Sequence, residues 1–287
     1  MIIDNTQDNY DIGVLICRTS SIGDVVLASS CLDLLEKISL KFKVCWIGSR
    51  PSSKLIRNFW PNVVVLDLND FGELHSLYEY IYSINIKFNI IIDIQRNIRS
   101  SFVCKHLSKI FHAKVYYLEK HSIKRFLMIM RSYLLGRMFK LSRDVLIPNY
   151  YQYDLMCLTL KKALIRQGYC SSEILHIKSV PKLFLNTQSN FILDKSMLWV
   201  AVAVGAAHDT KRAPVPVFLD ILNKILYSFQ IQFSSQKLGL IFLGDHNDIK
   251  TTNDVINQIH WPFEIKNFCG KLDIENVPYI LSNAKFI

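Results

Sequence analysis

Short runs of apolar, β-branched residues alternate with longer segments in which apolar residues recur at helical spacing. This alternation is typical of strands and helices built around a parallel sheet. It predicts strands in the first half of the chain at residues 14–17, 44–47, 63–66, 90–94 and 115–118. The predicted helices between them span residues 24–38, 74–84 and 98–111. The first half is therefore predicted to be a doubly wound α/β domain.

The same pattern begins again in the second half, after a less regular stretch that contains Pro148, Gly168, Pro181 and a helix near residues 153–166. Here the predicted strands are 198–204 and 238–243, and the predicted helices are 217–229, 249–259 and 274–281. We therefore expect two Rossmann-like domains, residues 1–185 and 186–287. The last four residues resemble the start of another buried strand, so the second domain is expected to be incomplete.

Half of the 287 residues are hydrophobic, 20% are charged, and the mean hydropathy is positive. Such a chain can bury a large core, which excludes disordered, collagen-like and coiled-coil proteins. The most apolar uncharged stretch, residues 197–208, is shorter than the roughly 20 residues of a membrane-spanning helix. An acidic start at residues 1–11 and seven cysteines without a C-x-x-C pair predict a soluble cytoplasmic protein with reduced thiols.

The net charge of +10 is concentrated in one part of the chain. Residues 96–143 contain twelve basic residues against a single acid, Glu119. This concentration predicts a basic face rather than a diffuse surplus of charge. Such a face could bind nucleic acid, an anionic membrane surface or a phosphorylated substrate.

A small polar loop, R-T-S-S-I-G-D at residues 18–24, follows the first predicted strand and leads into the first predicted helix. Its backbone N–H groups are expected at the carboxyl end of the sheet, where open α/β folds bind ligands. There Gly23 would let a substrate approach the backbone, and Asp24 would face the same crevice. The alternative is that Asp24 only caps the helix and complements its dipole.

A second polar loop, residues 205–214, follows the first predicted strand of the second half. Small residues, a hydroxyl group and two adjacent cations suit the binding of a diphosphate. Lys211 is placed to offset negative charge on a departing phosphate. The alternative is an ordinary solvated loop between a strand and a helix.

Several familiar motifs are absent from the sequence. It contains no G-x-G-x-x-G, no phosphate-binding P-loop, no G-x-S-x-G and no H-E-x-x-H. The cysteines and histidines do not show the spacing of a zinc site. We therefore expect neither a metal nor a cofactor.

Four segments carry a family pattern when they are taken together. Residues 14–29 contain R-T-S-S-I-G-D-V-V-L-A-S, and residues 91–101 are similar to D-x-Q-G-x-x-[KR]-S. Residues 205–214 are similar to G-A-x-x-x-T-K-R-W-P, and residues 241–245 and 267–271 are similar to a later strand and an N-x-x-G-K-T turn. In this order the segments resemble glycosyltransferase family 9, the ADP-heptose:lipopolysaccharide heptosyltransferases.

The resemblance implies a GT-B fold, with two Rossmann-like domains facing a cleft, and transfer of heptose from ADP-heptose to the inner core of lipopolysaccharide with inversion. It implies that Asp24 is the general base and that Lys211 meets the leaving ADP. Donor contacts are expected at Gly205, Thr210, Lys211 and Arg212. Acceptor contacts are expected at Ser21, Gly23, Gln95, Arg99, Lys124 and Arg125. The basic face would then meet an anionic acceptor at the inner face of the inner membrane, and nucleic acid is not expected as a partner.

The sequence departs from the family pattern at several places. Arg96 stands where the pattern has Gly, Ala213 where it has Trp, and Leu272 where it has Thr. The pattern also continues into a D-[ST]-G-x-x-H-x-A loop that this sequence does not reach. An alternative to the enzyme is therefore an inactive, truncated heptosyltransferase that retains at most acceptor binding.

Overall fold

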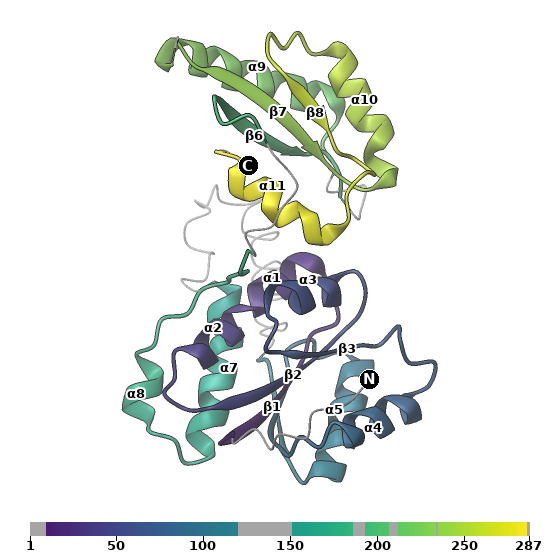
Figure 1. Cartoon of the computed structure of the whole chain (residues 1–287), viewed down its shortest axis with the longest axis vertical. Coiled ribbons are helices and arrows are strands. Elements are labelled where there is room, and N and C mark those ends of the chain that lie inside the picture. The colour runs from purple at the N-terminus through teal and green to yellow at the C-terminus, as the bar shows by residue number, and fades with distance from the viewer. Residues whose placement is uncertain (1–9, 120–150, 186–192, 207–211, 234, 286–287) are drawn as a thin grey trace, which may run out of the picture. The chain divides into compact units, whose positions relative to one another are not determined.

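A computed structural model of the chain describes residues 10–119, 151–185, 193–206, 212–233 and 235–285. The chain divides into two compact units, Met1–Phe184 and Leu185–Ile287, which we call unit 1 and unit 2 (Figure 1). Each unit contains a parallel β-sheet with helices packed on both faces. The units are described separately below.

The described part of unit 1 forms a five-stranded sheet in the order β3-β2-β1-β4-β5, with every neighbouring pair parallel. The central strand β1 is buried along its whole length, as expected for a parallel strand covered on both faces. The strands are β1 (Ile12–Cys17), β2 (Phe42–Gly48), β3 (Val64–Asp67), β4 (Phe88–Asp93) and β5 (Lys114–Tyr117).

Helices cover the two faces of this sheet (Figure 1). Apolar residues of α4 and α5 pack against alternate residues of the strands, such as Leu15 and Ile47. On the other face, α1 and α2 contact α7, which also contacts β4 and β5. The helices are α1 (Ile22–Ala28), α2 (Ser30–Glu36), α3 (Ser52–Phe59), α4 (Leu74–Ser83), α5 (Ile98–Phe111), α7 (Gln152–Arg166) and α8 (Ser171–Leu175).

The described part of unit 2 has a smaller parallel sheet, in the order β6-β7-β8. Its strands are β6 (Met197–Ala203), β7 (Lys237–Leu243) and β8 (Ile265–Asn267). Helices α9 (Val215–Gln232) and α10 (Ile249–Gln258) pack on one face, and α11 (Val277–Asn283) packs on the other. Two 3₁₀ turns, η3 (His246–Asp248) and η4 (Ile274–Asn276), precede α10 and α11.

All seven strands predicted from the apolar runs are confirmed, with ends that differ by one or two residues. The helix predicted at residues 24–38 is wrong as a single helix, because the structure has α1 and α2 with a break at Ser29. The Ser29 hydroxyl donates to the carbonyl of Val26 at 2.7 Å, and such local bonds compete with regular helix. The prediction missed α3, α8 and β8, which have only eight, five and three residues.

The strand expected at residues 284–287 lies partly outside the described residues. The backbone N–H of Lys285 donates to the carbonyl of Trp199 at 2.9 Å. This bond places the segment after α11 beside β6, at the edge of the sheet opposite β8. Residues 286 and 287 are not described.

Candidate functional site

In unit 1 the candidate residues lie at the carboxyl edge of the sheet, around β1 and β4. These two strands are neighbours, and the helices that follow them pack on opposite faces. Loops that diverge in this way leave a crevice, which is where open α/β sheets bind ligands. The loop after β1 carries Ser21, Gly23 and Asp24, and the segment after β4 carries Gln95 and Arg99.

Asp24 stands in the first turn of α1 and caps that helix. Its Oδ2 accepts hydrogen bonds from the backbone N–H of Ser21 at 3.4 Å and from the Ser21 hydroxyl at 3.1 Å. Its Oδ1 accepts from the side-chain amide of Gln152 in α7 at 3.2 Å. The side chain is 29% exposed, so the capping role and access to solvent coexist.

Arg18 is the residue at this edge that the sequence did not single out. It is buried at the end of β1, and its guanidinium forms an ion pair with the Asp24 carboxylate. A second nitrogen, Nη1, donates to the carbonyl of Ile94 at 3.1 Å, and the Arg18 carbonyl accepts from the indole of Trp46 at 3.3 Å. Arg18 therefore holds the carboxylate of Asp24 at the carboxyl edge of the sheet.

Gln95 joins the segment after β4 to the loop after β1. Its Oε1 accepts from the backbone N–H groups of Thr19 at 3.2 Å and Ser20 at 3.3 Å. Its Nε2 donates to the Ser20 hydroxyl at 3.3 Å. These contacts give Gln95 a role in holding the loop, alongside the acceptor role expected from the sequence.

Arg96, which departs from the family pattern, has a left-handed backbone with φ of +48°. Glycine adopts this conformation readily and other residues do so at a cost, which accounts for the Gly of the pattern. Hydrogen bonds from its backbone and its side chain hold Arg96 in place. Its N–H donates to Asp93 at 2.7 Å, and its guanidinium donates to the carbonyl of Leu118 at 2.7 Å.

A polar pocket of about 240 Å³ opens at the same edge. Hydroxyl groups from the loops after β1 and β2, together with Arg99 at the start of α5, line it. Of the predicted acceptor residues, Arg99 therefore faces a cavity, whereas Lys124 and Arg125 lie outside the described residues. The polar lining residues are Thr19, Ser20, Ser49, Asn97, Arg99 and Ser100.

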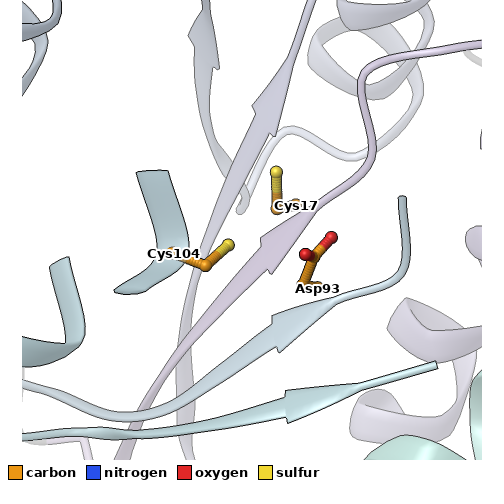
Figure 2. Close-up of side chains that lie close together, drawn as sticks. All are labelled: Cys17, Asp93 and Cys104. Carbon is orange, nitrogen blue, oxygen red and sulfur yellow. The ribbon is translucent and has the colours of Figure 1, made fainter. Parts of the chain in front are cut away.

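Cys17 lines this pocket and lies close to Asp93 and Cys104 (Figure 2), and the ligand atoms of the three residues are within 4.8 Å of one another. A metal would need the thiols as thiolates. A hydrogen bond with Cys17 and burial raise the pKa of Cys104 far above its ordinary value, so a metal would have to displace the proton of this thiol in order to bind.

The carboxylate of Asp93 accepts hydrogen bonds from residues at and just before the start of α5. It accepts from the hydroxyls of Ser100 at 2.8 Å and Ser101 at 2.9 Å, and from the N–H of Arg96 at 2.7 Å. These bonds satisfy a fully buried charge. They also set the direction in which α5 leaves the edge, and so the position of Arg99.

Replacing Asp93 with Asn is expected to lower the free energy of unfolding by about 1–3 kcal/mol, because an amide cannot accept all three bonds with its oxygen. Urea denaturation of the two proteins measures the difference. Asp220→Asn is the matched control, since Asp220 is 59% exposed and forms an ion pair with Lys224 one turn away; its cost is expected below about 1 kcal/mol. Equal costs for both substitutions would contradict the structural role of Asp93.

In unit 2 the corresponding edge is formed by Gly205 after β6 and Gly244 after β7. Asp248, in η3, is buried directly beneath Gly205, and a Cβ built on Gly205 would lie 2.0 Å from its Oδ2. The same oxygen accepts from the N–H of Asp245 at 3.0 Å. Asp248 was missed in the sequence because it lies 43 positions from Gly205.

Arg212 lies beside this carboxylate. Its Nε donates to the carbonyl of Ala206 at 3.0 Å, and one Nη lies 3.9 Å from Oδ1 of Asp248. Arg212 thus connects the two ends of the candidate donor loop. Thr210 and Lys211, the other residues expected at the diphosphate, lie outside the described residues.

Solved structures of glycosyltransferases have the same fold. A glycosyl transferase family 9 protein from Veillonella parvula matches 98% of this chain and 76% of its own, with a TM-score of 0.62 and 16% identity. The ADP-heptose LPS heptosyltransferase II of E. coli matches 96% of this chain and 77% of its own, with a TM-score of 0.63 and 12% identity. The E. coli heptosyltransferase WaaC, solved with ADP, matches 96% of this chain and 80% of its own, with a TM-score of 0.58 and 15% identity.

At these identities the matches establish the fold, which is the predicted α/β fold of GT-B type with two parallel sheets. Comparison with protein-family models gives no match, and comparison with curated protein sequences gives none either. Among the described residues, no helix is both long and apolar enough to cross a membrane.

Proposed function

We propose that this protein is a glycosyltransferase that transfers a heptose from ADP-heptose to the inner core of lipopolysaccharide, with inversion at the anomeric carbon. The main support is Asp24, a partly exposed carboxylate that is held at the carboxyl edge of the unit 1 sheet by Arg18 and the N-terminus of α1. The order of the sequence motifs and the GT-B type fold agree with this assignment.

In the proposed reaction, a hydroxyl oxygen of the acceptor attacks the anomeric carbon of the heptose while the bond from that carbon to the diphosphate oxygen breaks. Asp24 accepts the hydroxyl proton, and ADP leaves with the bonding electron pair. A single displacement needs one base and no covalent intermediate, so inversion follows. The hydrogen bonds to Ser21 and Gln152 and the ion pair with Arg18 would keep the carboxylate oriented while it accepts this proton.

The donor side of the proposal is the loop after β6. Lys211 and Thr210 would bind the diphosphate oxygens, and the positive charge of Lys211 would stabilise the ADP that leaves. Gly205 supports this placement, because the buried Asp248 leaves no room for a side chain there. Arg212 would keep the loop closed through its bond to Ala206.

The acceptor side is the pocket beside β1 and β4. Arg99 and the hydroxyl of Thr19 offer a cation and a hydrogen-bond donor to the carboxylates or phosphates of an inner-core acceptor. Lys124 and Arg125 belong to the basic stretch that would meet the same acceptor at an anionic membrane face.

Calorimetry on the full chain tests the donor half of this proposal. ADP-heptose and ADP are expected to bind with dissociation constants on the order of micromolar. Lys211→Ala is expected to weaken both by about 10- to 100-fold, since hydrogen bonds to a charged group contribute about 1.5–3 kcal/mol. Lys224→Ala is the control, because Lys224 is 73% exposed on α9 and pairs with Asp220. A chain that binds neither nucleotide would contradict the proposal.

A further inference from the structure

Two thiols and a carboxylate meet on one face of the unit 1 sheet (Figure 2). Cys17 and Asp93 are partners in the parallel register of β1 and β4, so their side chains leave the sheet on the same side. Cys104 of α5 belongs to the same buried core cluster as Cys17. The spacing of cysteines along the sequence could not indicate this group, because its members come from three separate elements that only the fold brings together.

The distances within the group are close to those of a zinc site. The two sulfur atoms and a carboxylate oxygen all lie within 4.8 Å of one another. In a tetrahedral site, with Zn–S of about 2.3 Å and Zn–O of about 2.0–2.2 Å, neighbouring ligand atoms are about 3.6–3.8 Å apart. The three atoms would therefore have to approach one another by no more than about 1.2 Å. Two thiolates favour zinc over magnesium or calcium, which prefer oxygen ligands.

The carboxylate of Asp93 is already oriented by its neighbours. Its Oδ1 accepts from the N–H of Arg96 and the hydroxyl of Ser100, and its Oδ2 accepts from the hydroxyl of Ser101 at 2.9 Å. A carboxylate has about four lone-pair positions, so these three bonds leave one for a metal ion. Hydrogen bonds of this kind orient the ligands of metal sites and are part of what determines metal affinity.

An ion can reach the group through the polar pocket at the carboxyl edge. Cys17, Asp93 and Cys104 are 1%, 0% and 0% exposed, but Cys17 lines the pocket of about 240 Å³. Water in that pocket can supply a fourth ligand. Two thiolates, one carboxylate and Zn²⁺ carry a net charge of −1, and the guanidinium of Arg99 in the same pocket lining offsets this charge.

We propose that Cys17, Cys104 and Asp93 bind one zinc ion, with a water molecule as the fourth ligand. The inference is independent of the proposed transferase activity. On binding, a Zn–S bond replaces the S–H bond of each cysteine, and the two protons pass to the buffer. Nothing is oxidised or reduced. The ion would connect the ends of β1 and β4 to α5, and so hold the helix that carries Arg99.

Cobalt binding to the full chain tests the proposal, because Co²⁺ occupies tetrahedral zinc sites and is coloured. The reduced chain, freed of metal with a chelator, is titrated with Co²⁺. We expect one ion per chain, the visible bands of tetrahedral cobalt, and an ultraviolet sulfur-to-cobalt band with the intensity of two thiolates. Zn²⁺ is then expected to displace the cobalt and remove the colour. A folded, reduced chain that shows no sulfur-to-cobalt band at saturating Co²⁺ would overturn the proposal.

Cysteine variants locate the ion. Cys17→Ser and Cys104→Ser are each expected to halve the sulfur-to-cobalt band per bound ion. Each should weaken zinc binding at least about 100-fold, since loss of an outer hydrogen bond alone costs about 10–100-fold. Cys45→Ser is the matched control, because Cys45 is 0% exposed in the same core cluster but lies outside the ligand group. Cys170→Ser controls for the exposed thiol.

Both controls are expected to keep the full band and the affinity for zinc. An equal loss in Cys45→Ser or Cys170→Ser, or a full band in both Cys17→Ser and Cys104→Ser, would place the ion elsewhere and overturn the proposal. The band of the unmodified chain itself counts the bound thiolates. The test therefore remains decisive even where a variant fails to fold.

Discussion

Asp24→Asn is expected to lower the rate of heptose transfer by about 10²- to 10⁴-fold, the range that a positioned general base contributes. Asparagine has nearly the same shape and its oxygen can still accept the hydrogen bonds from Ser21. It cannot take up the proton of the acceptor hydroxyl. The loss is therefore expected in kcat, because the amide keeps the shape of the carboxylate and loses only its basicity. Release of ADP in the presence of the lipid acceptor measures the rate.

A capping residue elsewhere in unit 1 provides the control for Asp24→Asn. Asp154 occupies the same position in the first turn of α7, and its Oδ2 accepts from the N–H of Tyr151 at 3.2 Å. Asp154→Asn removes an equivalent cap charge from the helix whose Gln152 donates to Asp24, so it also measures what disturbing that neighbour alone costs. If the two variants retain similar transfer rates, Asp24 is a structural cap and the catalytic assignment is wrong. Unfolding curves for both proteins show whether the loss of charge beside Arg18 affects stability.

The fold was largely predictable because its strands are buried on both faces. In β1 every residue is buried, and in β7 every residue after Lys237 is buried, so continuous apolar runs identify them. The elements that were missed lack such a signal. β8 consists of three half-buried residues, and α3 begins with two buried serines whose burial depends on tertiary contacts. The break between α1 and α2 depends on a single serine hydroxyl.

The position of the candidate site was predictable, but its internal contacts were not. Polar loops after parallel strands meet at one edge of a sheet, which is a rule of the fold. The partners of Asp24 depend on residues distant in the sequence: Gln152 lies 128 positions away, and Arg18 has the sequence context of a strand end. The same holds for Asp248, whose contact with Gly205 arises from the packing of η3 against the end of β6. Local spacing carries no information about such pairs.

Gly205→Ala is expected to reduce the affinity for ADP-heptose at least about tenfold and to lower the free energy of unfolding by about 1–3 kcal/mol, the usual cost of overpacking. The added Cβ would lie 2.0 Å from Oδ2 and 2.3 Å from Cγ of Asp248. Neither the backbone at residue 205 nor the side chain of Asp248 can move easily. Residue 205 closely follows the end of β6, and Asp248 accepts a hydrogen bond from the N–H of Asp245. The start of the donor loop must therefore shift, and with it the groups that would bind the diphosphate.

Two further variants test whether the contact with Asp248 causes this loss: Gly23→Ala, and Gly205→Ala combined with Asp248→Ala. A Cβ on Gly23 meets nothing within 4 Å, so this variant is expected to keep the donor affinity and to gain up to about 1 kcal/mol of stability from the better helix former. In the double variant Gly205→Ala with Asp248→Ala, the clash disappears and part of the lost affinity is expected to return. Calorimetry with ADP-heptose measures all three proteins. If the double variant binds no better than Gly205→Ala alone, the carboxylate of Asp248 is not what requires glycine at this position, and the donor loop is not positioned by the contact that the structure shows.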